Sequence, residues 1–190
     1  MLDLWPTLRI EGWEIDETLI YMAREFFGLS NLENLTRAGG SLNIHVGDAL
    51  SPAASVRGGF AGIIVDLFSN GKILPQLREA ATWLEMEEKL MPNGRVMVNC
   101  GGMHAEISDS GYIKINRKNS FNGQWVQNST IRAMCRAFPD KLNWKRMDGN
   151  DSENYLALTG PEPDLDAWSA ALPAPLNMNV RHWKPCQPAW

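Results

Sequence analysis

The stretch Phe60-Ala61-Gly62-Ile63-Ile64-Val65-Asp66-Leu67-Phe68 decides the fold class of this chain. Its middle residues, Ile63 to Val65, form an apolar run without the alternation of apolar and polar residues that marks a half-exposed strand. An uninterrupted run of this kind is typical of a parallel strand that is covered on both faces. We therefore predict a central strand of a parallel sheet here, with Asp66 at its carboxyl end.

The amino-terminal side of that stretch contains a predicted strand–helix–strand unit. Alternating apolar and polar residues over 8–16 predict the first strand. A helix over residues 17–27, which Gly28 ends, follows from apolar residues spaced three and four apart. These apolar residues are Leu19, Ala23, Phe26 and Phe27. Residues 42–46 form the second strand pattern, which Gly47-Asp48-Ala49 closes.

The carboxyl-terminal side adds further helices and strands. We predict a helix that begins at Pro75, a turn over residues 92–94, a strand over residues 95–100, a helix over residues 126–138, strands over residues 143–147 and 155–159, and a short helix over residues 164–172. The side chains expected to face inward are Leu77, Ala81 and Leu84 on the first of these helices and Ile131, Met134, Cys135 and Phe138 on the second.

The order of these elements predicts the fold class. The last two strands should pair as an antiparallel hairpin, because strong turn-forming residues join them. The preceding elements alternate between strands and helices. We therefore predict an α/β, three-layer Rossmann-like fold, with a mostly parallel sheet and a C-terminal antiparallel hairpin.

Composition is that of an ordinary folded domain. Hydrophobic residues make up 44% and charged residues 21% of the chain, as in globular proteins. The net charge of −4 argues against a nucleic-acid partner, which calls for clustered Lys and Arg. The longest apolar run is too short to cross a bilayer, so we expect no membrane partner. The length predicts one domain over residues 1–160, followed by a tail rich in Pro and Trp over residues 161–190.

The cysteines indicate a reducing compartment. Cys100, Cys135 and Cys186 are odd in number and widely spaced, unlike the disulfide framework of a secreted protein. We expect an intracellular, cytoplasmic protein, or an organellar one if a targeting peptide precedes this sequence. A zinc site of Cys100, His104, His182 and Cys186 lacks the tight ligand spacing of structural zinc sites, so we expect no metal.

Acidic residues follow three successive predicted strands, at Glu14, Asp48 and Asp66. Ligands of doubly wound sheets bind beyond the carboxyl ends of the strands. There Glu14 can accept hydrogen bonds from two ribose hydroxyls, and Asp48 can bind the amino group of an adenine. Alternatively, Glu14 is a solvated acid near the start of a helix and Asp48 is a turn residue. Asp16 is better explained as an acid at that helix start.

Segments around these acids resemble the successive motifs of spermidine-synthase-like proteins, within the class I S-adenosylmethionine (SAM)-dependent methyltransferase superfamily. The segments are Trp13-Glu14-Ile15-Asp16-Glu17, Val46-Gly47-Asp48-Ala49, Ile63-Ile64-Val65-Asp66-Leu67-Phe68 and Leu90-Met91-Pro92-Asn93-Gly94. The similarity covers about residues 2–160. It implies the SAM-dependent methyltransferase form of the fold, with SAM or decarboxylated SAM as the cofactor.

The resemblance also implies which residues contact that cofactor. The implied contacts are Glu14 on the ribose hydroxyls, Asp48 and Ala49 at the adenine, and Asp66 beside the sulfonium, with Ile15, Gly47 and Leu67 as further cofactor-binding residues. The catalytic residue is not identified, and Asp66 is the candidate for it.

The sequence departs from the family pattern in two places. In aminopropyltransferases, the segment after Asp66 carries a second Asp that deprotonates the amine, and Ser69 stands there instead. A serine hydroxyl cannot accept this proton near neutral pH without help. The family's first strand and glycine-rich loop are also missing ahead of Glu14. We therefore expect an N-terminally truncated form, in which each unpaired buried backbone group would cost about 1 to 3 kcal/mol.

These patterns together predict a SAM-binding, methyltransferase-like protein related to spermidine synthases. Its acceptor is a small molecule or another substrate that the sequence does not identify, and activity of this form is left open. Aminopropyl transfer in polyamine synthesis is one alternative. A non-catalytic remnant that acts through a protein partner is another, and self-association as a homodimer is left open.

Overall fold

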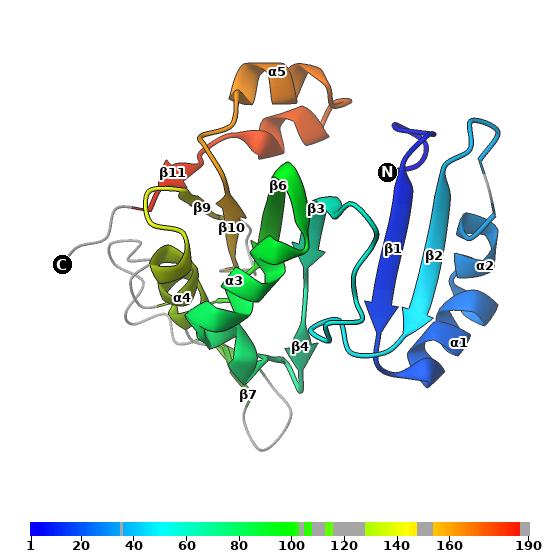
Figure 1. The fold of residues 1–190 in the computed structure, drawn as a ribbon, viewed down its shortest axis with the longest axis horizontal. Coiled ribbons are helices and arrows are strands. Elements are labelled where there is room, and N and C mark those ends of the chain that lie inside the picture. The colour runs from blue at the N-terminus through cyan, green and yellow to red at the C-terminus, as the bar shows by residue number, and fades with distance from the viewer. Residues whose placement is uncertain (35, 103–104, 108–112, 116–127, 148–153, 187–190) are drawn as a thin grey trace. The chain divides into compact units, whose positions relative to one another are not determined.

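The computed structural model describes residues 1–34, 36–102, 105–107, 113–115, 128–147 and 154–186. The chain divides into two compact units, Met1–Ser55 and Val56–Trp190, and each unit has a sheet of its own (Figure 1). The domain over residues 1–160 and the tail over residues 161–190 stay a prediction. None of the described helices combines the length and the apolar composition needed to cross a membrane.

The first unit has the predicted strand–helix–strand order. Its elements are β1 (Arg9–Glu14), α1 (Glu17–Phe26), α2 (Leu29–Leu32) and β2 (Ser41–Val46). β1 and β2 pair in parallel, from Arg9 opposite Ser41 to Glu14 opposite Val46. Because the strands are parallel, their carboxyl ends lie at the same edge of this two-stranded sheet.

Local signals set the two ends of α1. The Asp16 carboxylate accepts a hydrogen bond from the Thr18 N–H at 2.8 Å and so caps the first turn. Gly28 follows the helix with φ 75°, in the left-handed region that favours glycine. The prediction that Asp16 serves the helix start is therefore confirmed.

The buried side of α1 differs from the prediction. Leu19, Phe26 and Phe27 are exposed, whereas Ile20 is buried. The reason is that apolar residues occur around most of this helix. Their spacing therefore locates the helix correctly but does not identify the side that packs against the sheet.

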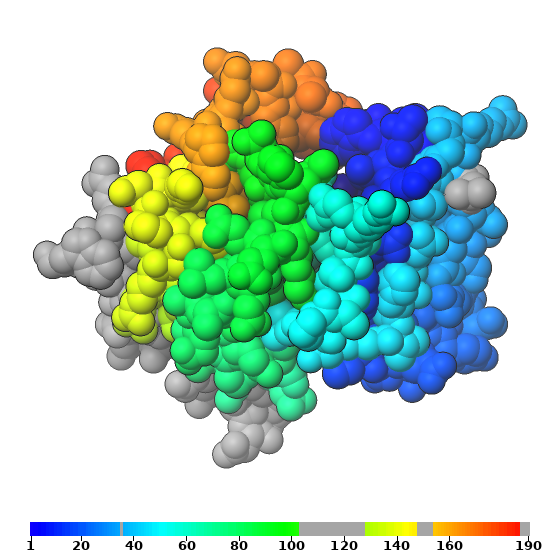
Figure 2. All heavy atoms as spheres, in the orientation of Figure 1, coloured from blue at the N-terminus to red at the C-terminus, as the bar shows by residue number. Residues whose placement is uncertain are grey.

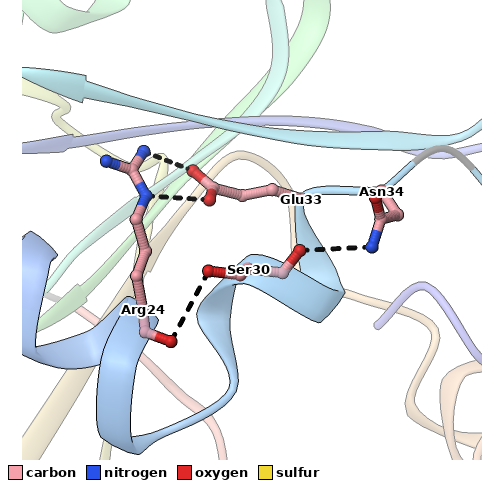
Figure 3. A network of polar contacts seen from close by, with 4 residues as sticks. All are labelled: Arg24, Ser30, Glu33 and Asn34. Atoms are coloured by element: carbon pink, nitrogen blue, oxygen red, sulfur yellow. Dashed lines mark hydrogen bonds and ion pairs between the residues drawn. The ribbon is translucent and has the colours of Figure 1, made fainter.

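A polar network joins the end of α1 to α2 (Figure 3). The Arg24 guanidinium donates two hydrogen bonds to the Glu33 carboxylate, at 2.9 and 2.6 Å. Ser30 Oγ donates to the Arg24 carbonyl at 3.5 Å, and Asn34 Nδ2 donates to the Ser30 carbonyl at 3.2 Å. The two-pronged Arg24–Glu33 contact fixes the geometry of this turn, although an exposed ion pair adds little to stability.

The second unit contains a five-stranded sheet in the order β11–β9–β10–β6–β3. The strands are β3 (Phe60–Val65), β6 (Leu90–Asn99), β9 (Leu142–Arg146), β10 (Tyr155–Thr159) and β11 (Lys184–Pro185). β3 and β6 are parallel, and the other three pairings are antiparallel. The sheet is therefore mixed. The α/β class and the β9–β10 hairpin of the prediction are confirmed, while the residues between those two strands lie outside the described ranges.

The position of β3 corrects the prediction of a central strand. Among the described strands β3 pairs only with β6, and Ile64 is 66% exposed. Its apolar composition is nevertheless that of a strand covered on both faces. The predicted turn at residues 92–94 is also wrong: this segment lies inside β6, with Asn93 at φ 65°. It produces a register shift opposite β3.

Two short hairpins accompany the main sheet. One consists of β4 (Phe68–Ser69) and β5 (Lys72–Ile73), and the other of β7 (Ala105–Ile107) and β8 (Ile113–Ile115). Asn70 and Gly71, with φ 51° and 68°, form the two-residue turn between β4 and β5, as expected for an Asn-Gly pair. Phe68 therefore belongs to this hairpin and not to the strand that contains Ile63.

The described helices of the second unit are η1 (Pro75–Arg78), α3 (Ala80–Glu88), α4 (Ser129–Ala137), α5 (Leu165–Ala170) and η4 (Leu176–Val180). α3 and α4 pack against each other, and both contribute to one face of this unit (Figures 1 and 2). The helix predicted from Pro75 starts as a 3-10 turn. Leu77 is buried as predicted, but Ala81 and Leu84 are exposed, and Trp83 and Met86 are buried in their place.

The break between η1 and α3 explains this second correction. Glu79 is extended between the two elements, with φ −106° and ψ 131°, so the periodicity that starts at Pro75 does not continue across it. α4 has no such break, and its four predicted inward residues, Ile131, Met134, Cys135 and Phe138, are all buried. The helical period therefore predicts the buried face only where one helix is continuous.

Candidate functional site

The carboxyl ends of β1 and β2 bring the first predicted site residues together. Glu14 lies opposite Val46, and the Gly47 N–H donates a hydrogen bond to the Glu14 carbonyl at 2.9 Å. The two motifs, Glu14-Ile15 and Gly47-Asp48-Ala49, are therefore neighbours at one sheet edge. This placement follows from the parallel pairing of two consecutive strands.

The Glu14 carboxylate is half-buried and partly used by the chain itself. Its Oε1 accepts a hydrogen bond from the Asp16 N–H at 2.9 Å. Within the described part of the chain, no polar group contacts Oε2. A carboxylate accepts several hydrogen bonds, so Glu14 retains the capacity to bind hydroxyl donors. Ile15, next to it, is 71% exposed and offers an apolar surface.

Asp48 is exposed at the start of the segment that follows β2. Its Oδ1 accepts a hydrogen bond from the Leu50 N–H at 2.8 Å, which is the geometry of an Asx turn. Asp48 therefore does act as a turn residue, and this contact occupies one of its two carboxylate oxygens. The other oxygen, Oδ2, has no partner among the residues that the structure describes.

Gly47 leaves open space beside these two acids. A Cβ atom placed on Gly47 would meet no heavy atom within 4 Å. Ala49, two residues on, is half-buried and has a small side chain. A planar ligand can therefore approach the backbone at Gly47 closely, which a larger side chain would prevent.

Asp66 and Leu67 belong to the second unit. Asp66 is exposed at the carboxyl end of β3, and its Oδ1 accepts a hydrogen bond from Asn99 Nδ2 at 3.0 Å. Asn99 ends β6, and its Oδ1 in turn accepts the Gly101 N–H at 3.1 Å. Asn99 therefore orients Asp66, and sequence reasoning missed it. The available signal was its position at the end of a predicted strand next to the one that ends at Asp66.

Asn128 is a second residue that the sequence analysis missed. Its side chain is buried, and Oδ1 accepts hydrogen bonds from the N–H groups of Thr130 and Ile131 at 3.0 and 3.1 Å. Its Nδ2 donates to the Cys100 carbonyl at 2.9 Å. Asn128 therefore caps α4 and joins it to the end of β6.

Four residues also form a cluster on one face of the β1–β2 sheet. Glu11 Oε2 lies 2.6 Å from His45 Nε2, and Asn43 Nδ2 donates to Glu11 Oε1 at 2.8 Å. The Trp13 and His45 rings stack, with centroids 4.8 Å apart. Burial raises the pKa of Glu11, but the hydrogen bonds from His45 and Asn43 outweigh it, so the pKa is lowered. This cluster could not be predicted from the sequence, because it depends on the register between β1 and β2.

A cavity of about 630 Å³ lies at the opposite, amino end of β6. Residues from Leu90 to Arg95 line it, together with Lys141 and the segment from Thr159 to Pro161. The Arg95 guanidinium donates to the Pro161 carbonyl at 2.8 Å, so its charge is already engaged in the loop. This cavity contains none of the predicted site residues.

The described residues contain no group of three or more His, Cys, Asp and Glu side chains arranged to hold a metal ion. His104, one of the four residues of the zinc site considered from the sequence, lies outside the described ranges. Trp144 and Trp183 are buried, and Trp168 stacks on Trp183 with centroids 6.2 Å apart. These tryptophans therefore act as packing residues.

Comparison with known proteins gives matches in structure and not in sequence. No protein-family model and no curated protein sequence matches the chain. Human methyltransferase-like protein 13, in complex with SAH, matches with a TM-score of 0.58 and 18% identity, over 94% of this chain and 70% of that one. A probable spermidine synthase from Corynebacterium glutamicum matches with a TM-score of 0.58 and 21% identity, over 90% of this chain and 56% of that one.

These two matches define the fold. The chain has the class I SAM-dependent methyltransferase-like fold, as the resemblance implied. It spans little more than half the length of the bacterial neighbour. At these identities the likeness establishes the fold alone, so the activity must be argued from the site.

Proposed function

We propose that this chain binds SAM and is a methyltransferase-like protein. The observation that carries the proposal is the pairing of two carboxylates, Glu14 and Asp48, at the carboxyl ends of adjacent parallel strands. Each carboxylate has one oxygen committed to the backbone and one oriented to no described partner. Binding beyond strand ends at this edge is the usual mode of such sheets.

The residues at this edge fit an adenosine group. Glu14 Oε2 would accept hydrogen bonds from the two ribose hydroxyls, and Asp48 would accept one from the adenine amino group. The open backbone at Gly47 gives the base room, while Ile15 and Ala49 supply apolar contacts. The bound cofactor supplies the electrophilic methyl group, and these residues only bind and orient it.

The resemblance implies two further cofactor contacts. Asp66 and Leu67 are the residues proposed to act on the reacting end of the cofactor, and Asn99 holds the Asp66 carboxylate in one orientation. Asp66 is the candidate catalytic residue. The acceptor is proposed to be a small molecule that these residues do not specify.

Aminopropyl transfer is not favoured. The position of the family's second carboxylate is Ser69, which lies in the short β4–β5 hairpin and is exposed. Its hydroxyl is a poor base near neutral pH. The likeness to a probable spermidine synthase supports the fold and does not replace this missing carboxylate.

Isothermal titration calorimetry tests the proposal. The whole chain is titrated with SAM, with its demethylated product S-adenosylhomocysteine, and with decarboxylated SAM. We expect binding of SAM and S-adenosylhomocysteine, and Glu14→Gln and Asp48→Asn should each weaken it by about tenfold, since a hydrogen bond to a charged group contributes roughly 1.5–3 kcal/mol. Glu25→Gln is the matched control, because Glu25 is an exposed acid of the same unit.

Two outcomes would contradict the proposal. Equal affinity in all three variants would exclude the assigned acids. Failure of the folded chain to bind any of the three compounds would favour a non-catalytic protein that acts through a partner. Clear preference for decarboxylated SAM would instead revive aminopropyl transfer, which an assay with putrescine would then check.

A further inference from the structure

The cavity at the amino end of β6 lies apart from the predicted site residues of the second unit. Its volume of about 630 Å³ is in the range of pockets that bind small molecules. β3 and β6 run parallel, so this cavity and Asp66, at the carboxyl end of β3, lie at opposite edges of the sheet. A ligand in this cavity is therefore distinct from the cofactor proposed above.

The backbone of β6 shapes one wall of the cavity. Ala61 of β3 stands opposite the segment 91–94 of β6, because the register shifts between the pairs on either side. The extra residues bulge out of the strand, with Asn93 at φ 65°. A Cβ on Gly94 would lie 2.7 Å from the Phe60 carbonyl oxygen, so only glycine fits there. The bulge is therefore fixed in shape, and its residues line the cavity.

Arg95 is held at the wall of the cavity by backbone carbonyls. Its Nη1 donates to the Pro161 carbonyl at 2.8 Å and to the Thr159 carbonyl at 3.4 Å. A Cβ on Gly160 would lie 3.2 Å from Arg95 Cζ, so the guanidinium lies directly against this glycine, whose φ is 96°. Nε and Nη2 of Arg95 make no hydrogen bond to the described residues, and no described carboxylate pairs with it. Because carbonyls carry no net charge, Arg95 keeps its positive charge and free donors.

The remaining side chains give the cavity a net positive charge and an apolar surface. Lys141 and Glu87 both line it and are exposed, and neither forms an ion pair with any residue in the described ranges. Together with Arg95, the lining carries two positive charges and one negative charge. The apolar part of the lining consists of Leu90, Met91, Pro92, Phe138 and Pro161. This combination matches a ligand with one negative charge and an apolar body.

We propose that this cavity binds a small organic acid, whose carboxylate pairs with Arg95 and Lys141 and whose apolar body contacts the apolar lining. The flat fork of a guanidinium can donate two parallel hydrogen bonds to a carboxylate, and Arg95 retains donors for them. Glu87 selects against ligands with more than one negative charge, since like charges repel. The inference does not rest on the proposed binding of SAM.

Titration of the isotope-labelled whole chain with phenylacetate, followed by NMR, tests the proposal. The neutral analogue phenylacetamide and inorganic phosphate are the comparison compounds. A ligand of this size should bind with a dissociation constant of about 1 mM. We expect phenylacetate to shift the amide signals of Gly94, Arg95 and Gly160. It should bind about tenfold more tightly than phenylacetamide, because the amide forms no ion pair.

Variants of the three charged residues locate the site. Lys141→Gln and Arg95→Gln should each weaken phenylacetate binding by about tenfold, whereas Glu87→Gln should bind at least as tightly as the wild type. Lys72→Gln is the matched control, because Lys72 is an exposed lysine of the same unit outside the cavity. The Lys141 side chain forms no hydrogen bond or ion pair within the described chain, so this variant tests the proposal even if the loop at Pro161 needs Arg95 to fold.

Four results would overturn the proposal. Equal affinity for phenylacetate and phenylacetamide would exclude a role for the two cations, and unchanged binding in Lys141→Gln would place the carboxylate elsewhere. Equal affinity for inorganic phosphate would reduce the cavity to a simple anion site. The absence of shifts at the lining amides, at about ten times the expected dissociation constant, would show that the cavity binds no organic acid.

Discussion

At the scale of single residues, Glu14 and Asp48 combine a local role with a remaining binding capacity. Glu14 Oε1 accepts the Asp16 N–H, and Asp48 Oδ1 accepts the Leu50 N–H. These internal bonds fix the orientation of both carboxylates before a ligand binds. Preorganised acceptors of this kind cost less ordering on binding than freely rotating side chains do.

Gly47 provides a test that separates binding from folding. Because a Cβ at this position meets nothing within 4 Å, Gly47→Val should change the free energy of unfolding by less than about 0.5 kcal/mol. The added side chain should occupy the space proposed for the adenine and weaken SAM binding by at least about tenfold. Calorimetry and urea unfolding measure the two effects, and Gly47→Ala should give an intermediate loss. Unchanged affinity in Gly47→Val would place the adenine elsewhere.

Sequence reasoning found acids that end strands and missed amides that support them. Glu14, Asp48 and Asp66 could be predicted because strand ends are visible in the apolar pattern. Asn99 also ends a predicted strand, but its contact with Asp66 depends on β3 and β6 being neighbours. Likewise, the Glu11–His45 contact exists only because β1 and β2 pair in one particular register, which the sequence does not state.

At the scale of elements, cross-strand contacts stabilise β1 and β2 as a pair. Glu11 of β1 contacts both Asn43 and His45 of β2, and polar side-chain contacts across a strand pair favour the pairing. Little apolar burial stabilises this sheet otherwise, since Ile20 and Ala54 are the only buried apolar residues in the described part of the first unit.

The lowered pKa of Glu11 predicts how this contribution depends on pH. The folded value lies below the ordinary value near 4.5, so the ionised carboxylate stabilises the fold above pH 4.5, and this stabilisation is lost as pH falls through the lowered value. Urea unfolding of the wild type and Glu11→Gln between pH 7 and pH 3 should show a difference that shrinks at the acid end. Glu25→Gln should show no such trend, and a constant difference for Glu11→Gln would contradict the assignment.

The caps of α4 and α5 predict a graded loss of stability. Asn128 is buried and bonds to two N–H groups and a carbonyl, so Asn128→Ala should cost about 2 kcal/mol in free energy of unfolding. Asp164 caps α5 through one bond, to the Ala167 N–H at 3.0 Å, and is exposed. Asp164→Ala should therefore cost less, as urea unfolding would measure. Equal losses would show that burial of the cap does not matter.

The buried face of a helix was predicted correctly only where the helical period is unbroken. α4 satisfied its prediction because nine residues run without interruption. The prediction for the helix that begins at Pro75 was wrong in part, because the extended residue Glu79 interrupts the helical period between η1 and α3. β3 was correctly predicted as an apolar strand, but the sheet order that places it at an edge follows from pairing and not from its own composition.

At the scale of the whole molecule, the core is distributed unequally between the two units. The second unit buries the sheet residues Val96, Val98 and Ala157 and the inward side of α4. The first unit depends on the β1–β2 ladder and on α1. The proposed cofactor contacts at Glu14 and Asp48 therefore lie in the part of the chain with less buried apolar surface. A bound ligand there should reduce local opening.

Hydrogen exchange with and without S-adenosylhomocysteine tests this account most directly. Amide exchange of the whole chain is followed by mass spectrometry at a ligand concentration about 100 times the measured dissociation constant. The account predicts added protection in peptides that contain Glu14 to Asp16 and Gly47 to Leu50. Added protection confined to the cavity around Leu90 to Arg95, with the ends of β1 and β2 unchanged, would contradict it.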